Sequence, residues 1–189
     1  MIYLIGGAPR IGKSIIAREL ANKIDAKFVS TDDLEMPKGG LTWPSFSDNP
    51  LENTTTPSER VNLQIEISKA LEPTIENLIT KASYEQKNVV IEGIHLLPSH
   101  VVQYIQKYSA KAIFIGWKDA MAVLAGMAQN DNPNDWLKDA NEDVRRQVVG
   151  FTVAFSEYIE PEAKKYGLSY IERTENFVED VKHVISMLI

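Results

Sequence analysis

Two glycines, a lysine and a serine near the start of the chain have a spacing that suits phosphate binding. Gly7 and Gly12 flank four residues, and Lys13 and Ser14 follow directly. Backbone N–H groups of such a loop surround phosphate oxygens, the ammonium reaches the outer phosphates, and the hydroxyl is a ligand for Mg²⁺. The pattern is the Walker A motif, GxxxxGK[ST]. The residues expected to bind the nucleotide are Gly7, Ala8, Pro9, Arg10, Ile11, Gly12, Lys13, Ser14 and Ile15.

The flanks of this segment are those that a phosphate loop requires. The apolar run 2–5 precedes it and reads as a buried strand, and residues 13–24 follow with apolar positions at helical spacing. A helix N-terminus behind the loop adds its N–H groups and its dipole to the anion site. An ordinary glycine-rich turn has no need of Lys13 and Ser14 at this spacing. The sequence therefore predicts ATP and Mg²⁺ as cofactors.

Two adjacent carboxylates are candidates for the chemistry of phosphoryl transfer. Asp32 and Asp33 follow the predicted strand 27–30, at the strand end where open α/β sheets bind ligands. A carboxylate there can orient an acceptor hydroxyl and take its proton, while Mg²⁺ prefers hard oxygen ligands. We favour Asp32 as the base and as a metal candidate, and Asp33 as a second catalytic and acceptor-binding candidate. Helix capping by one of the pair is the alternative.

Composition narrows the class of protein. A chain of 189 residues with 44% hydrophobic residues is typical of one globular domain with insertions. A net charge of −6 argues against broad electrostatic binding to nucleic acid or to an anionic membrane. The absence of cysteine gives no support to an oxidising compartment, and no targeting or membrane-spanning run is apparent. We expect a cytoplasmic protein, monomeric or homodimeric.

Short apolar runs alternate with helical patterns along the chain. Such alternation predicts an α/β fold with a parallel sheet between two layers of helices. We expect a five-stranded sheet in the order 2-3-1-4-5, within one domain over residues 1–189. The strands are expected at 2–5, 27–30, 88–91, 112–115 and 168–171.

Two crossovers are longer than a single covering helix requires. The first, 34–87, begins with a loop rich in proline and glycine and continues as a helix that Pro73 is expected to kink or split. The second, 117–167, contains helices on both sides of a polar turn, and Pro161 is expected to interrupt the later one. Trp43, Phe46 and Trp117 are candidates for lining an acceptor pocket, although large aromatic residues more often pack in the core.

This layout resembles the nucleoside-monophosphate-kinase group of P-loop kinases. The resemblance implies that crossover 34–87 binds the phosphoryl acceptor and that crossover 117–167 is a mobile lid. It also implies that lid arginines neutralise charge on the transferred group, and Arg145 and Arg146 are the arginines of that segment. The alternative for both is an exposed helix surface beside acidic neighbours. Arg173 falls where related kinases contact the adenine base.

The segment Val89–Pro98 provides a second motif. An apolar strand that ends in Glu92 is typical of a Walker B element, with the carboxylate near the metal or the acceptor. The run Glu-Gly-Ile-His-Leu-Leu-Pro is similar to one in the 2-phosphoglycerate kinase family. The resemblance implies that Glu92 and His95 face the acceptor. A purely structural role for His95 is the alternative.

Together these features predict an ATP-dependent kinase of a small molecule, with a 2-phosphoglycerate-like acceptor suggested by the family resemblance. A nucleoside or nucleotide kinase is the first alternative and would need a base pocket in the first crossover. A regulatory P-loop ATPase that acts on a protein partner is the second. The two long crossovers favour a kinase, because they can enclose a small acceptor.

Overall fold

Five short strands form the centre of the structure, a computed structural model that describes residues 1–34, 46, 55–129 and 135–189. The inner strands are largely buried because helices cover both faces of a parallel sheet. The two edge strands are partly exposed. The strands are β1 (Ile2–Gly7), β2 (Lys27–Ser30), β3 (Val89–Gly93), β4 (Ala110–Gly116) and β5 (Ser169–Glu172).

All strands run parallel in the order β2-β3-β1-β4-β5, which confirms the predicted topology. The register pairs Ile5 of β1 with Glu92 of β3, and pairs Ser30 of β2 with the same Glu92. The carboxyl ends of these three strands therefore lie at one edge of the sheet, and the loops that follow them meet there.

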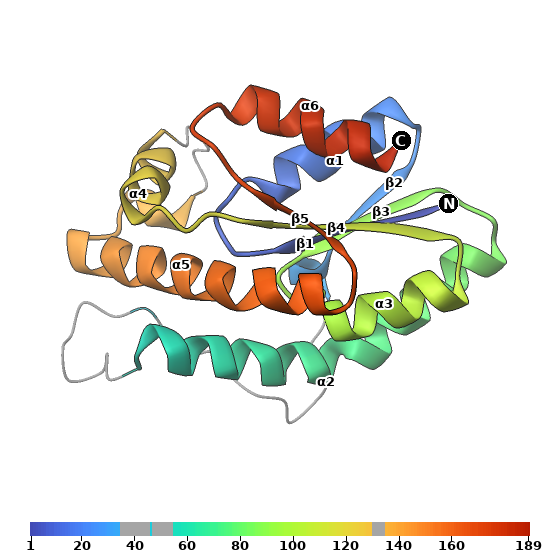
Figure 1. The fold of residues 1–189 in the computed structure, drawn as a ribbon, viewed down its shortest axis with the longest axis horizontal. Coiled ribbons are helices and arrows are strands. Elements are labelled where there is room, and N and C mark those ends of the chain that lie inside the picture. Colours follow the sequence, from blue (N-terminus) through green and yellow to red (C-terminus); the bar gives the residue numbers. More distant parts are fainter. Residues whose placement is uncertain (35–45, 47–54, 130–134) are drawn as a thin grey trace.

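Helices on both faces of the sheet give the predicted three layers (Figure 1). Helices α1 and α6 cover one face, and α2, α3 and α5 cover the other. Helix α4 lies beyond the carboxyl ends of the strands. None of the described helices is long and apolar enough to span a membrane. The helices are α1 (Lys13–Lys23), α2 (Pro57–Tyr84), α3 (Pro98–Lys107), α4 (Ala120–Ala128), α5 (Glu142–Lys165) and α6 (Phe177–Leu188).

The two longest helices continue through prolines that were expected to interrupt them. Pro73 lies inside α2 and Pro161 lies inside α5, and neither ends its helix. Leu71 and Ile75, on either side of Pro73, are buried in the core. Apolar packing thus outweighs the loss of one backbone hydrogen bond at the proline. The expectation that Pro161 interrupts α5 was wrong, as was a split of α2 at Pro73, whereas a kink at Pro73 stays a prediction.

A small apolar cluster lies outside the main core and belongs mostly to the second crossover. Phe46 of the first crossover joins it, and its ring stacks on that of Trp136 with 5.9 Å between centroids. The two crossovers therefore contact each other through Phe46. The buried members of the cluster are Leu137, Val144 and Val148.

Replacing Phe155 by alanine is expected to destabilise the protein by about 3–5 kcal/mol, because the ring is fully buried in the main core. Denaturant unfolding measures this loss. Tyr84→Ala is the matched control, since the Tyr84 side chain is 89% exposed and its removal should cost less than about 0.5 kcal/mol. Equal losses for the two variants would contradict the placement of the core.

Candidate active site

The phosphate loop connects the end of β1 to the start of α1. Gly7 and Gly12 have φ values of 129° and 88°, which residues with a Cβ rarely adopt. A Cβ on Gly7 would also lie 1.9 Å from the carbonyl oxygen of Ile115, so this position requires glycine for space as well. Gly12 is the N-cap of α1 and provides no side-chain cap. The first N–H groups of the helix are therefore not occupied by a capping side chain, as an anion site requires.

Side chains from three places in the fold hold the carbonyl oxygens of this loop. Such bonds fix the peptide planes before a ligand binds, so that little reorganisation is needed for phosphate binding. The donors lie on α1, on α5 and just after β5. The bonds run from Lys13 to Ala8, from Thr152 to Pro9 at 3.3 Å, and from Arg173 to Ile11 at 3.2 Å.

A cavity of 590 Å³ opens beside the phosphate loop, in the size range of small-molecule sites. It brings together residues from the carboxyl ends of β1, β2 and β3, from α4 and from the start of α6. Lys13, Asp32, Glu92 and Arg173, each predicted separately, all line it. The described lining residues are Pro9, Arg10, Gly12, Lys13, Ser14, Ile15, Asp32, Glu92, Ile94, Gly126, Met127, Gln129, Arg173 and Phe177.

Lys13 and Glu92 are the two buried charges of this cavity. Burial lowers the pKa of the Lys13 ammonium, and the negative charges of Glu92 and Asp32 oppose that shift. The carboxylate of Glu92 accepts hydrogen bonds from the hydroxyls of Ser14 at 3.0 Å and Ser30 at 2.7 Å. Glu92 is thus held beside the hydroxyl of the phosphate loop, and its role as a Walker B carboxylate stays a prediction.

The oxygen atoms of Ser14, Glu92 and Asp32 suit Mg²⁺. This ion prefers hard oxygen ligands and is usually held by one or two carboxylates together with substrate phosphates and water. Among the described residues, no three His, Cys, Asp or Glu side chains gather closely enough to hold a metal by themselves. Phosphate oxygens and water would therefore complete the coordination.

The adjacent aspartates have different surroundings. Asp32 lines the cavity, whereas Asp33 is not among its described lining residues. Asp32 Oδ1 lies 3.6 Å from Nδ1 of His95, and that nitrogen lies 3.0 Å from the hydroxyl of Thr31. The side chain of Ser30 caps the 3₁₀ turn that contains both aspartates, so neither aspartate caps that turn. The cavity position favours Asp32 over Asp33 for contact with an acceptor.

His95 is expected to make stability depend on pH. Burial lowers the pKa of its imidazole from 6.5 to about 4. Because the folded pKa lies below the unfolded one, the stabilisation is present above pH 6.5 and is lost as the pH falls to about 4. A shift of this size corresponds to on the order of 3 kcal/mol. His95→Asn should reduce the change in the free energy of unfolding between pH 6.5 and about 4, as measured by urea unfolding at successive pH values.

His183→Asn is the matched control, because His183 lies on an exposed part of α6. This variant should keep the pH dependence of the unfolding free energy seen in the unmodified protein. Burial also lowers the pKa of His100, which accounts for part of any remaining slope. A pH dependence that survives His95→Asn unchanged would contradict the assignment.

Arg173 packs against two aromatic rings beside the cavity. Its guanidinium carbon lies 3.9 Å from the centre of the Trp117 ring and 4.4 Å from that of Phe177. Burial lowers the pKa of this guanidinium. Arg173 and Phe177 both line the cavity, so an adenine contact at Arg173 fits this arrangement and stays a prediction.

Arg145 and Arg146 do not line the described cavity. Arg145 donates to the carbonyl oxygens of Leu137 at 3.3 Å and Lys138 at 2.9 Å. Arg146 is exposed and pairs with Glu142 one helical turn away, the surface arrangement that the sequence left as the alternative. A lid role for either arginine stays a prediction.

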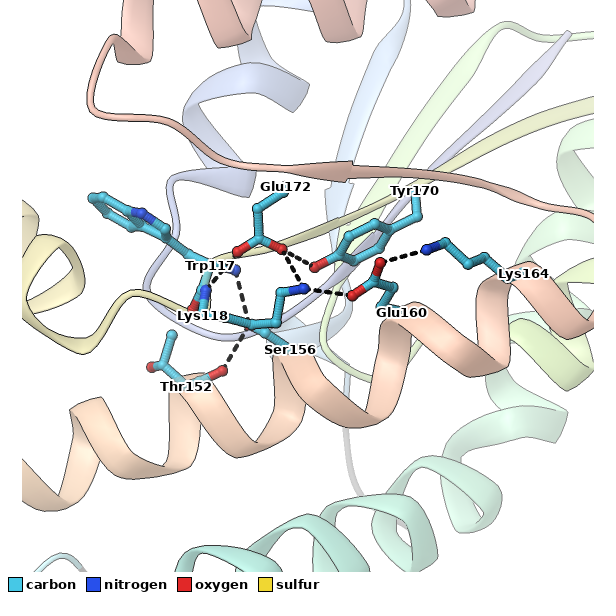
Figure 2. A network of polar contacts seen from close by, with 8 residues as sticks. All are labelled: Trp117, Lys118, Thr152, Ser156, Glu160, Lys164, Tyr170 and Glu172. Atoms are coloured by element: carbon cyan, nitrogen blue, oxygen red, sulfur yellow. Dashed lines mark hydrogen bonds and ion pairs between the residues drawn. The ribbon is translucent and has the colours of Figure 1, made fainter.

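A polar network fixes the start of the second crossover (Figure 2). The backbone N–H of Lys118 donates to Glu172 at 2.6 Å, and its ammonium pairs with Glu160 at 2.5 Å and Glu172 at 3.3 Å. The N–H of Trp117 donates to the hydroxyl of Ser156 at 2.9 Å. These bonds connect the end of β4 to α5 and β5.

Sequence reasoning missed Thr152 and Asp135. Thr152 belongs to a row of polar residues on α5 at four-residue spacing, and that row within an apolar face was a readable signal. Asp135 pairs with Arg10, 125 residues away, and no local pattern connects the two.

Of the aromatic candidates for an acceptor pocket, Phe46 and Trp117 pack against other side chains. Trp43 lies outside the described residues.

Comparison with known proteins gives one curated relative. The 2-phosphoglycerate kinase of Methanothermobacter thermautotrophicus is 25% identical over 190 residues, which include 93% of this chain. The aligned part is 61% of that relative, so the chain spans less than two thirds of its length. No family model matches the chain.

Solved kinase structures share the fold. A gluconokinase from Sinorhizobium meliloti 1021 has a TM-score of 0.55 at 14% identity, over 98% of this chain and 90% of the other. A shikimate kinase from Bacteroides thetaiotaomicron has a TM-score of 0.55 at 13% identity, and the match covers 100% of this chain and 98% of that kinase. The predicted three-layer α/β/α fold with a five-stranded parallel sheet is therefore confirmed.

Proposed function

We propose that residues 1–189 form a single kinase domain that transfers the γ-phosphoryl group of ATP to a hydroxyl or phosphate group of a small molecule. The observation that supports this most is the convergence of Lys13, Glu92 and Asp32 on one cavity beside the phosphate loop. A cation for the phosphates and carboxylates for metal and acceptor are the groups that phosphoryl transfer uses. The 2-phosphoglycerate kinase relative supports the same class.

The side chains suggest a division of tasks. Lys13 and the loop N–H groups bind the β- and γ-phosphates, and Glu92 and Ser14 would provide oxygen ligands for a Mg²⁺ ion that would neutralise phosphate charge. Asp32 orients the acceptor hydroxyl and takes its proton. The bond between the acceptor oxygen and the γ-phosphorus forms as the bond to the leaving β-phosphate oxygen breaks, and ADP departs.

A 2-phosphoglycerate-like compound is the first acceptor to test. It has a carboxylate and a phosphate, which favour binding by arginine. Arg60 is the arginine of the first crossover, but it is buried against the Phe46 ring and is not among the described lining residues of the cavity. That crossover has few other basic residues, so neutral sugars and nucleosides belong in the same test.

The experiment is ADP release from Mg·ATP across a panel of 2- and 3-phosphoglycerate, nucleosides, nucleoside monophosphates, sugars and aminoglycosides. Lys13→Ala serves as the blank. We expect one class of acceptor to stimulate release in the unmodified protein and not in the blank. Stimulation by nucleosides or nucleotides would replace the phosphoglycerate-like acceptor. Stimulation by a protein alone would favour a regulatory ATPase and contradict the proposal.

A further inference from the structure

Arg10 has an unusual backbone conformation within the phosphate loop. Its φ is 61°, in the left-handed region, as at Gly7 and Gly12 on either side of it along the loop. A residue with a Cβ costs roughly 1–2 kcal/mol in that conformation, which glycine avoids. An arginine at such a position suggests a role for its side chain, because strained residues gather at functional sites.

The Arg10 guanidinium forms an ion pair with Asp135 of the second crossover. The Asp135 side chain is 3% exposed and that of Arg10 is 26% exposed. Asp135 also accepts a hydrogen bond from the N–H of Leu137 at 3.1 Å, which orients its carboxylate. A guanidinium has five N–H donors, so a carboxylate on one side leaves donors for a second anion.

Arg10 also belongs to the phosphate side of the cavity. It lines the cavity with Lys13 and Ser14. The cavity therefore offers two cationic side chains, those of Arg10 and Lys13, to a bound polyphosphate.

The other candidate arginines are engaged elsewhere. Arg173 donates to the carbonyl oxygen of Ile11 and packs against Trp117 and Phe177. Arg145 and Arg146 are bonded within their own crossover and do not line the described cavity. Arg10 and Arg173 are the described arginines that line the cavity, so Arg10 is the remaining candidate for contact with a γ-phosphoryl group.

We infer that Arg10 contacts the γ-phosphoryl group of bound ATP and neutralises its charge during transfer, and that Asp135 is a positioning residue for the guanidinium. This inference rests on the proposed function. Arg10 forms and breaks no covalent bond: the acceptor oxygen replaces the β-phosphate oxygen on phosphorus, and the acceptor proton passes to Asp32. Arg10 thus supplies from the phosphate loop the charge that lid arginines were expected to supply.

Kinetics of Arg10→Ala and Asp135→Asn test the two roles. Arg10→Ala is expected to lower kcat about 100-fold with the KM for ATP changed less than about three-fold, because the interaction strengthens in the transition state. Arg10→Lys should lower kcat about ten-fold, since an ammonium lacks the planar, paired N–H donors of a guanidinium. Asp135→Asn should also lower kcat about ten-fold. In a chain that already carries Arg10→Ala, it should lower kcat no further.

Calorimetry provides a readout that needs no acceptor. ADP with aluminium fluoride imitates the phosphoryl group in transfer and should bind the unmodified protein more tightly than ADP alone. Arg10→Ala is expected to weaken the aluminium fluoride complex about 100-fold and to leave ADP binding unchanged. If the unmodified protein phosphorylates no acceptor, the proposed function fails, and this comparison still decides whether Arg10 contacts the γ-position.

Arg18→Ala is the matched control. Arg18 is exposed on α1, its guanidinium carbon lies 4.0 Å from the centre of the Phe28 ring, and it is not among the described lining residues. This variant should leave kcat and both affinities unchanged. The inference is wrong if Arg10→Ala and Asp135→Asn lower Tm but keep kcat and aluminium fluoride binding within about two-fold, because the pair then only fastens the second crossover to the loop.

Discussion

Asp32→Asn is expected to slow phosphoryl transfer by about 10²–10⁴-fold with little change in the affinity for ATP. The amide keeps the shape of the side chain but cannot take the proton of the acceptor hydroxyl. Asp32 is 69% exposed at its side chain, so the substitution should leave the fold and Tm unchanged. Steady-state kcat and ATP binding by calorimetry, measured on the same preparation, check both parts of the prediction.

Asp33→Asn is the matched comparison, one residue further along the same turn. Because Asp33 is not among the described residues of the cavity, the loss should stay below about ten-fold. A larger loss for Asp33→Asn than for Asp32→Asn would reverse the assignment of the base. A loss in Asp32→Asn that excess Mg²⁺ restores would show that Asp32 acts mainly as a metal ligand.

Lys13→Ala is expected to lower kcat by about 10³-fold, because it removes the positive charge next to the β- and γ-phosphates. Lys13 is 7% exposed, and its hydrogen bond to the carbonyl oxygen of Ala8 also disappears, so some loss of loop order accompanies the loss of charge. Single-turnover kinetics at saturating ATP measures the rate of transfer apart from binding.

Lys23→Ala provides the control for Lys13→Ala. Lys23 lies in the last turn of α1 and is exposed, so its replacement should change kcat less than about two-fold. Unfolding of both variants by urea separates a loss of activity from a loss of folded protein. Unchanged transfer in a folded Lys13→Ala variant would contradict the role of the phosphate loop.

The sheet could be predicted from the sequence because its inner strands are buried on both faces. Apolar runs at Ile2, Val89 and Ile113 stand out against the polar surroundings, and all three residues are buried in the structure. The effect of the prolines could not be predicted in the same way. Whether a helix survives Pro73 depends on packing by the residues beside it, and packing is a property of the whole fold.

In the candidate site too, features set by local sequence could be predicted, and features set by the tertiary fold could not. The phosphate loop is contiguous, so its conformation and its lysine are evident from a local pattern. The lid role of Arg145 and Arg146 was predicted only from the crossover in which they lie. Their side-chain directions depend on which face of α5 packs inward, and the buried Val144 and Val148 turn both arginines away from the core. The partner of Arg10 was not predictable, because Asp135 meets it only through the tertiary fold.

The most direct test of the account is the fate of the γ-phosphoryl group, followed by phosphorus NMR in a reaction of the unmodified protein with Mg·ATP and the stimulating acceptor. For a kinase, we expect a new phosphorus signal on the acceptor that grows in step with ADP, with little inorganic phosphate. ADP accompanied only by inorganic phosphate, with every small acceptor unchanged, would contradict it and would identify the protein as an ATPase.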